Sequence, residues 1–217
     1  MPVTESSPRV YRLHRDRQRR RILGAAEKLF DDRGIDRVTM AEIVSATGVR
    51  ASTLYQYFSN KDEIVWAIVG KVISESAAAA EKVIGNVRGP ALAKITALLE
   101  FMADVLARNP AQVRFMAQFD ALYARDWSHE RLLTLEEQIV PQRFAGFATL
   151  IREGIADGSL RPDLDPDLTM HSVMNAVIGA QRRLASLGNR VEMEYGQPID
   201  RLFRETTRVI LLGLRAS

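Results

Sequence analysis

The sequence predicts an all-α protein, and three observations support this fold class. Apolar residues recur at helical spacing, as in Ile22, Ala26 and Phe30, which form one stripe along a helix. Glycines, prolines and capping pairs such as Asp165-Pro166 divide the chain into segments of helical length. No segment alternates apolar and polar residues as a half-buried strand does, and the chain contains no internal repeat.

Capping signals define four helices in the N-terminal part. Gly34 ends the first, which carries the apolar stripe. Thr39 and Glu42 form a capping box that opens the second, and Gly48 ends it. The fourth follows a Ser-Asn pair and continues through an alanine-rich stretch. Helices are therefore expected at about residues 16–33, 40–47, 51–58 and 61–83.

The rest of the chain is divided in the same way. Asn109-Pro110 separates two segments, Gly158 ends a long one, and Gly188, Gly196 and Pro198 interrupt the C-terminal part. Pro141 marks a boundary or a kink inside the long segment. Helices are expected at about residues 91–108, 110–123, 127–157, 166–187 and 199–214.

Composition excludes several classes of protein. The chain has 217 residues, of which 47% are hydrophobic and 26% charged, as in globular proteins. It has no cysteine, which excludes disulfides, thiolate zinc sites, iron–sulfur clusters and a cysteine nucleophile. No apolar run approaches the roughly 18–20 residues that span a bilayer, and the N-terminus lacks a secretory signal. We expect a soluble, cytoplasmic protein with no membrane partner.

Positive charge is concentrated at the N-terminus. Residues 1–61 hold 12 Lys and Arg against 7 Asp and Glu, whereas the remainder holds 18 against 20. A basic end suggests a nucleic acid or an anionic surface as partner, and the alternative is a solvated charge run. Residues 1–15 show no periodicity and predict a flexible basic arm. Its arginines, with those that follow, could reach a DNA minor groove, or the arm could be a solubilising tail. These arginines are Arg9, Arg12, Arg15, Arg17, Arg19, Arg20 and Arg21.

The most specific segment is TMAEIVSATGVRASTLYQYFSNKDEI, residues 39–64. Two short helices flank a tight turn at Gly48, where a positive φ lets the second helix cross the first. Leu54 and Phe58, four residues apart, direct one face of the second helix towards the core.

The opposite face of this second helix carries Ser52, Tyr55 and Gln56. A hydroxyl, a phenol and an amide can all donate hydrogen bonds, and none requires a buried charge. A short helix with such a face suits the DNA major groove. Arg50 before the helix and Lys61 after it lie where backbone phosphates would be. The alternative is an ordinary helical hairpin with aromatic surface residues.

The extended pattern resembles the TetR family of transcriptional regulators. The residues that match the family pattern are Gly34, Thr39, Gly48-Val49, Thr53-Leu54-Tyr55, Phe58 and Lys61, and the motif covers about residues 18–66. The segment GSLRPDLDPDL, residues 158–168, is also similar to the family's approach to its penultimate helix. The remainder matches only in length and helical order.

The resemblance implies an N-terminal three-helix helix-turn-helix DNA-binding domain, residues 16–62, after an arm at 1–15. A C-terminal helical ligand-binding and dimerisation domain would cover 63–217. It further implies a homodimer that binds a palindromic, double-stranded DNA operator and releases it when a small-molecule effector binds. By position, the phosphate contacts would be Thr39, Arg50, Thr53, Tyr57 and Lys61, and the residues near base edges Ala51, Ser52, Tyr55 and Gln56. Ala51 departs from members with a long polar side chain there, so Gln56 is the best candidate for base discrimination.

The resemblance also implies an effector cavity among the middle helices. Aromatic and methionine side chains there suit an apolar or aromatic ligand, although ordinary core packing is the alternative for each. The polar side chains of Gln118, His171 and Asn175 are candidates to orient the ligand. The candidate ligand-binding residues are Phe101, Met102, Phe115, Phe119, Tyr123, Trp127, Phe144, Phe147, His171 and Asn175.

The last two helices are expected to form the dimer interface as a four-helix bundle. Gly179 would allow close approach of the helices. The interface candidates are Val173, Ala176, Val177 and Ala180 on one helix, with Leu202, Phe203, Val209, Ile210, Leu212 and Leu214 on the other. Burial of these side chains within a monomer is the alternative.

No motif indicates catalysis, a metal or a cofactor. His14, His129 and His171 lack the spacing of metal ligands, and the Asp163–Asp167 loop lacks the glycine and glutamate of a calcium site. We therefore expect no catalytic residue, no metal and no cofactor. The alternative function is a helical small-molecule-binding protein or enzyme with an incidental basic N-terminus. A non-specific architectural DNA-binding protein is a third possibility.

Overall fold

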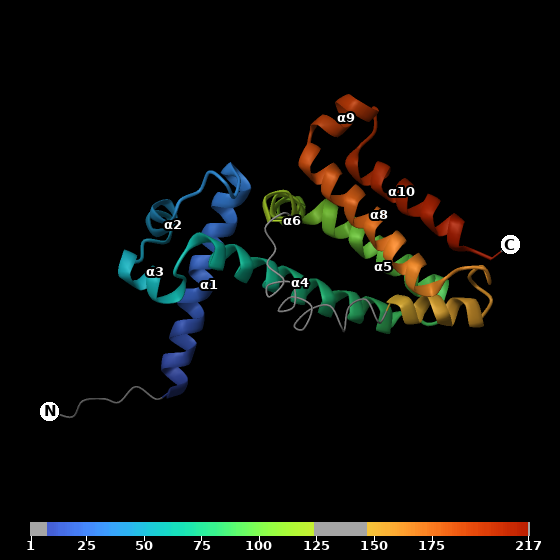
Figure 1. Cartoon of the computed structure of the whole chain (residues 1–217), viewed down its shortest axis with the longest axis horizontal. Helices are drawn as coiled ribbons and strands as arrows, with labels where there is room; N and C mark the ends of the chain where they lie inside the picture. Colours follow the sequence, from blue (N-terminus) through green and yellow to red (C-terminus); the bar gives the residue numbers. More distant parts are fainter. Residues whose placement is uncertain (1–7, 124–146, 217) are drawn as a thin grey trace. The chain divides into compact units, whose positions relative to one another are not determined.

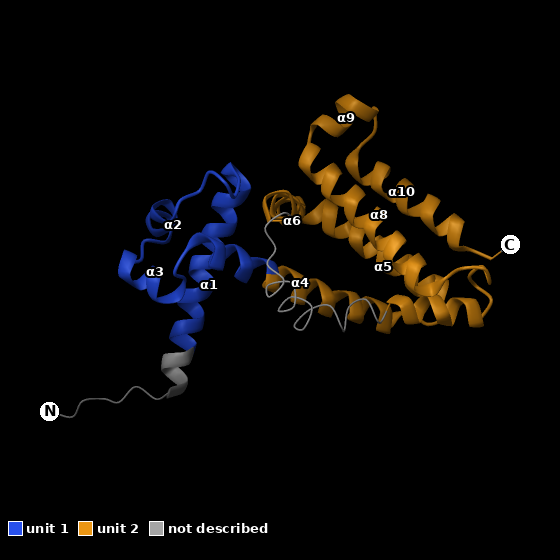
Figure 2. Ribbon diagram, in the orientation of Figure 1, with its two compact units in different colours: residues 1–69 blue, residues 70–217 orange. Residues whose placement is uncertain are grey.

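The computed structural model describes residues 8–123 and 147–216, with backbone alone for residues 8–12. The described residues are helical apart from turns, loops and one isolated bridge between Leu160 and Arg215, so the predicted all-α class is confirmed (Figure 1). They divide into two compact units, residues 1–69 and 70–217 (Figure 2).

The first unit consists of three helices and the start of a fourth. These are α1 (Pro8–Arg33), α2 (Met40–Thr47), α3 (Ala51–Tyr57) and α4 (Lys61–Asn86), which continues into the second unit. Ile22, Phe30, Ile43, Leu54 and Ile64 each expose 0% of their surface. The predicted stripe on α1 is therefore buried, and α1 packs against α2, which in turn packs against α3.

Helix α1 begins at Pro8, not near Asp16, so the prediction of a flexible arm over residues 1–15 is wrong from Pro8 onwards. Proline is accepted in a first helical turn because its missing N–H has no partner there in any case. Arg, Leu and Gln in this stretch are good helix formers, and glycine is absent from Pro8 to Leu23. The stretch lacks an apolar stripe because its described side chains lie outside the core, so its lack of periodicity does not indicate disorder. Residues 1–7 lie outside the described residues.

The second unit is built around α5 (Ala91–Arg108) and α8 (Pro166–Leu187). Helix α5 packs against α6 (Pro110–Tyr123), α8 and α10 (Ile199–Leu214), and α8 also packs against α6 and α10. The short α9 (Arg190–Tyr195), which the sequence did not predict, follows α8, and residues 147–156 are also helical. The core includes Ile95, Leu99, Ile151, Val177 and Phe203.

Side-chain caps fix the ends of two helices in this unit. Asp165 accepts a hydrogen bond from the N–H of Leu168, with Pro166 in the first turn, as the sequence predicted. Helix α5 has no cap of its own, because Pro90 precedes it. Its first N–H, from Ala91, donates instead to the Asp157 carboxylate at 2.8 Å. The turn after residues 147–156 therefore anchors the start of α5.

Candidate nucleic-acid interface

The turn between α2 and α3 has the geometry that the sequence predicts. Gly48 adopts φ 63° and ψ 15°, and its N–H donates to the Val44 carbonyl at 3.1 Å. This left-handed conformation suits glycine, so α2 ends there and α3 begins three residues later, at Ala51. The two helices form the helix-turn-helix at one edge of the first unit.

Helix α3 has one buried face and one polar face. Leu54 exposes 0% of its surface and Phe58, which caps the helix, 4%. Ser52 and Gln56 are exposed, and Tyr55 exposes 52% of its surface. Leu54 thus anchors the helix while a hydroxyl, a phenol and an amide extend into solvent. Of the other predicted DNA contacts, Thr39, Arg50 and Ala51 are exposed and Thr53, Tyr57 and Lys61 are half-buried.

A capping box fixes the start of α2. The backbone N–H and the hydroxyl of Thr39 donate to the Glu42 carboxylate at 2.8 and 2.9 Å, and the N–H of Glu42 donates to the Thr39 hydroxyl. Arg33 lies 2.7 Å from the same carboxylate. The hydrogen bonds from Thr39, together with Arg33, lower the pKa of Glu42 to about 2. The Thr39 hydroxyl must therefore leave Glu42 to donate to a phosphate.

Lys61 is the first residue of α4, and it ties this helix to the loop between α1 and α2. Its ammonium donates to the carbonyl of Ile35 at 2.8 Å and to that of Asp36 at 3.3 Å. An ammonium has three N–H donors, so one remains for a phosphate oxygen. The predicted phosphate contact is compatible with this arrangement, but Lys61 also holds the unit together.

Two arginines of α1 lie against the end of α3. The guanidinium carbon of Arg19 is 5.5 Å from the centre of the Phe58 ring, and that of Arg15 is 6.0 Å from the centre of the Tyr57 ring. The sequence predicts neither contact, because Arg15 falls within the expected flexible arm. Their spacing was the signal, because Arg15 and Arg19 continue the stripe of Ile22 and Ala26 by whole helical turns.

A family model decides the classification of this helix-turn-helix. Residues 22–68 match the model described as "Bacterial regulatory proteins, tetR family". This helix-turn-helix belongs to the TetR family. The chain is a DNA-binding transcriptional regulator and not an enzyme. The matched region begins at the buried stripe of α1 and ends in α4, so it covers the capping box, the glycine turn and α3.

Similarity to known TetR-family proteins extends beyond this region. The chain is 25% identical over 161 residues to the transcriptional repressor KstR2 of Mycolicibacterium smegmatis, covering 70% of this chain and 71% of that protein. The solved structure of KstR2 from Mycobacterium tuberculosis, a ketosteroid transcriptional regulator, covers 92% of this chain and 96% of its own with a TM-score of 0.69 at 20% identity. The solved structure of FadR from Bacillus halodurans, a fatty acid degradation regulator, covers 99% of this chain and 100% of its own chain, with a TM-score of 0.68 at 19% identity. The two structures establish the shared fold.

The candidate effector-binding residues fall into separate groups. Phe115 and Phe119 on α6 are buried, and the Phe119 ring stacks on Tyr123 at 5.2 Å between ring centres. Phe147 is buried in the core, whereas Phe101 and Met102 on α5 are half-buried against it. His171 and Asn175 are exposed on α8, outside the buried aromatic residues. Trp127 and Phe144 lie outside the described residues. The role of these side chains in binding an effector stays a prediction.

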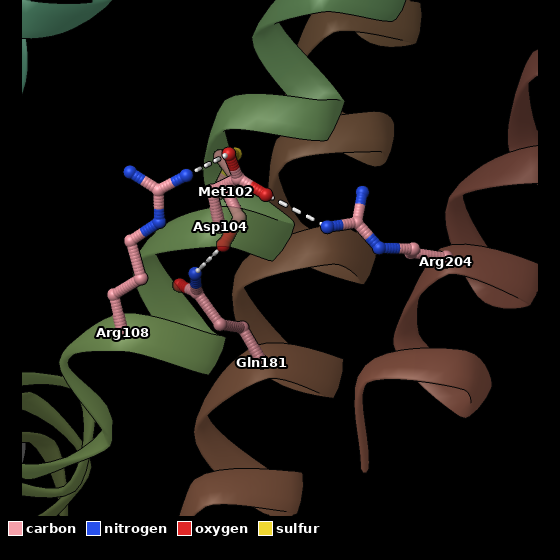
Figure 3. A network of polar contacts seen from close by, with 5 residues as sticks. All are labelled: Met102, Asp104, Arg108, Gln181 and Arg204. Carbon is pink, nitrogen blue, oxygen red and sulfur yellow. Dashed lines mark hydrogen bonds and ion pairs between the residues drawn. The ribbon is translucent and has the colours of Figure 1, made fainter. Parts of the chain in front are cut away.

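The buried polar groups of the second unit are different from those the sequence suggested. Gln181 on α8 exposes 8% of its surface and donates to the Met102 carbonyl on α5 at 2.7 Å (Figure 3). Beside it Asp104 accepts from Arg204 at 2.7 Å and from Arg108 at 3.3 Å. The signal for Gln181 was its position four residues after the buried Val177 and eight after the buried Val173.

An ion pair joins α6 to α8. The guanidinium of Arg182 on α8 contacts the carboxylate of Asp120 on α6, and the Arg182 side chain exposes only 26% of its surface. Burial of this guanidinium lowers the pKa of Arg182. Gln181 and Arg182 are neighbours, so adjacent residues of α8 bind polar groups on α5 and on α6.

The predicted dimer-forming residues divide between two faces. Val173, Val177, Phe203 and Leu214 are buried in the core of their own unit, so their assignment to an interface is wrong. Helix α8 carries small or apolar residues on both faces, and the sequence pattern alone does not distinguish the faces. The exposed face of α8 instead carries Leu168, Ala176 and Gly179, and that of α10 carries Val209 and Leu212.

The described residues contain no group of three His, Asp or Glu side chains placed to hold a metal ion. No helix among residues 8–123 and 147–216 is both long and apolar enough to cross a membrane.

Proposed function

We propose that this TetR-family regulator is a ligand-responsive repressor that acts in the cytoplasm. It binds a palindromic operator as a homodimer, and a small apolar or aromatic effector releases it. The observation that carries the proposal is the polar face of α3, where Ser52, Tyr55 and Gln56 are exposed opposite the fully buried Leu54. Such a helix fits a major groove, where an amide can pair with an adenine edge.

Exposed apolar residues in the second unit support the proposed dimerisation. Leu168 on α8 exposes 66% of its surface, and Val209 and Leu212 on α10 expose 57% and 55%. Ala176 and Gly179 on α8 leave room for a second helix. Pairing α8 and α10 with their copies around a two-fold axis covers these residues in a four-helix bundle. Each copy of α3 then binds one half-site, and the centres of the two half-sites lie about 34 Å, or a multiple of this distance, apart.

An effector acts by favouring one spacing of the two recognition helices over another. It shifts this equilibrium only by the difference between its affinities for the two states. Helix α4 is the candidate lever, because it begins in the first unit and continues into the second. The buried aromatic residues of α6 and the names of the relatives KstR2, a ketosteroid regulator, and FadR, a fatty acid degradation regulator, support an apolar effector.

Fluorescence anisotropy with the full-length protein tests this proposal. The probe is DNA flanking the protein's own gene, and the control is a scrambled duplex of equal length and composition. We expect specific binding at physiological salt that a subset of apolar compounds reverses, with a raised melting temperature of the protein. Equal affinity for both duplexes would support a non-specific architectural protein, and no affinity for either would support a small-molecule-binding protein.

A further inference from the structure

The core-facing stripe of α1 changes from apolar to cationic towards its N-terminus. Ile22 and Ala26 are fully buried. Arg15 lies seven residues before Ile22, Arg19 lies seven residues before Ala26, and both arginines are exposed. Residues seven apart lie nearly above one another on a helix. The arginines therefore belong to the face of α1 that is directed at the helix-turn-helix, and not to its outer surface.

Both guanidinium groups lie over aromatic rings at the end of α3. Arg19 is over Phe58 at 5.5 Å and Arg15 over Tyr57 at 6.0 Å. A cation–π contact attracts the guanidinium without using its N–H groups as hydrogen-bond donors. The two contacts therefore hold the cations against α3 and leave their hydrogen-bonding capacity available.

Neither Arg15 nor Arg19 forms an ion pair with a carboxylate within the part of the chain that the structure describes. Arg33 and Arg37 differ, because they pair with Glu42 and Asp36 at the other end of α1 and in the loop after it. A fixed, unneutralised arginine pair beside a recognition helix is suited to bind a phosphate, which guanidinium groups contact through paired hydrogen bonds.

We propose that Arg15, Arg19 and the Tyr57 phenol, which Arg15 covers, form a phosphate-binding rim. This rim contacts the DNA backbone beyond the base pairs read by α3. The proposal rests on the proposed function and extends its DNA footprint. It also replaces the minor-groove arm, because these arginines are carried by a helix and are held against α3.

Arg17 provides a matched control for the rim. It is an exposed arginine on the same helix, but two residues from Arg15, about 200° around the helix axis. Alanine at position 17 removes the same charge from the other face. Arg15→Lys supplies a second comparison, because lysine retains the charge and lacks the planar group that stacks on Tyr57.

The experiment measures the affinity of the full-length protein for its operator at several salt concentrations. Each phosphate contact contributes about 0.9 to the slope of log affinity against log salt. We expect Arg15→Ala and Arg19→Ala each to reduce the slope by about one, the double variant by about two, and Arg17→Ala to leave it unchanged. Arg15→Lys should give an intermediate affinity. Hydroxyl-radical footprints of the double variant should lose protection at the outer edges of each half-site.

Three outcomes would overturn the rim. If the salt slopes of the variants are unchanged and their melting temperatures are lower, the arginines only stabilise the position of α3. Equal losses for Arg15→Ala and Arg17→Ala would indicate diffuse charge. An unaltered footprint for the double variant would place the contacts elsewhere. In all three the wild-type protein still binds its operator, whereas a wild-type protein that binds no flanking DNA would contradict the proposed function itself.

Discussion

The Lys61 ammonium donates a hydrogen bond to the Ile35 carbonyl at 2.8 Å, across 26 residues of sequence. Lys61 begins α4, and Ile35 lies in the loop that leads from α1 to α2. One side chain therefore connects the helix that enters the second unit with the loop that precedes the helix-turn-helix. A residue matched to a phosphate-contacting position thus also has a structural role inside the DNA-binding unit.

Lys61→Ala should affect both stability and DNA binding. Loss of charged hydrogen bonds to two carbonyls should lower the free energy of unfolding by about 1–2 kcal/mol. Loss of one phosphate contact should reduce the salt slope by about one for all DNA sequences. Urea unfolding and anisotropy measure the two effects separately. A normal slope in a destabilised variant would show that Lys61 is structural only.

Gln56→Ala should relax sequence preference at one base pair in each half-site. Gln56 is exposed on the polar face of α3, and an amide paired to a base discriminates by about 1–3 kcal/mol. Selection from operators randomised at each position measures the preference. Ser52→Ala is the comparison on the same face, with a smaller expected effect. A uniform loss of affinity at every position would contradict base recognition by Gln56.

The capping box should make stability depend on pH in the acid range. Hydrogen bonds from Thr39 lower the pKa of Glu42 from 4.5 to about 2. A lowered pKa means that the ionised carboxylate stabilises the fold above pH 4.5, and that this stabilisation is lost as the pH falls towards 2. Glu42→Gln keeps an acceptor but cannot ionise, so its stability difference from wild type should shrink across this window. Denaturant unfolding at a series of pH values measures this difference, and a constant difference would contradict the prediction.

Val209→Asp and Leu212→Asp should convert the proposed dimer to a monomer. Both side chains are more than half exposed on α10, and burying an unpaired carboxylate in an interface is strongly unfavourable. Sedimentation velocity at micromolar concentration measures the change. Leu13→Asp is the control, because Leu13 on α1 exposes 58% of its surface in the first unit. A wild-type protein that sediments as a monomer would remove the two-half-site mechanism.

Gly154→Ala should destabilise the second unit. A Cβ at this position would lie 2.5 Å from a side-chain carbon of Leu160, which exposes 1% of its surface and has little room to move. Overpacking of this kind costs about 1–3 kcal/mol. Gly70→Ala is the matched control, since nothing lies within 4 Å of its Cβ position in α4, and it should be neutral or stabilising. Equal melting temperatures for the two variants would contradict the packing at Gly154.

The sequence predicted those elements whose ends carry local chemical signals. The bounds of α5, α6, α8 and α10 agree with the expected helices because proline, glycine and Asp165-Pro166 mark their ends. The capping box and the left-handed Gly48 are confirmed for the same reason. These features depend on residues within one turn of each other, so no tertiary information was needed.

The missed features depend on contacts between distant residues. The early start of α1 lacks an apolar stripe, so periodicity gave no signal, and α9 is only six residues long. Both faces of α8 carry small or apolar residues, and only the packing of α5 and α10 shows that Val173 and Val177 are internal. The bonds made by Lys61 and Gln181 each span at least 25 residues, and no local pattern encodes them.

Hydroxyl-radical footprinting of the wild-type protein on the DNA flanking its gene tests the central claim most directly. If the polar face of α3 reads DNA in a dimer, two protected half-sites should appear with their centres about one helical turn or a small multiple of it apart. Protection should disappear when Tyr55 and Gln56 are both replaced by alanine. Protection that is uniform along the duplex, or that survives this double replacement unchanged, would contradict the claim.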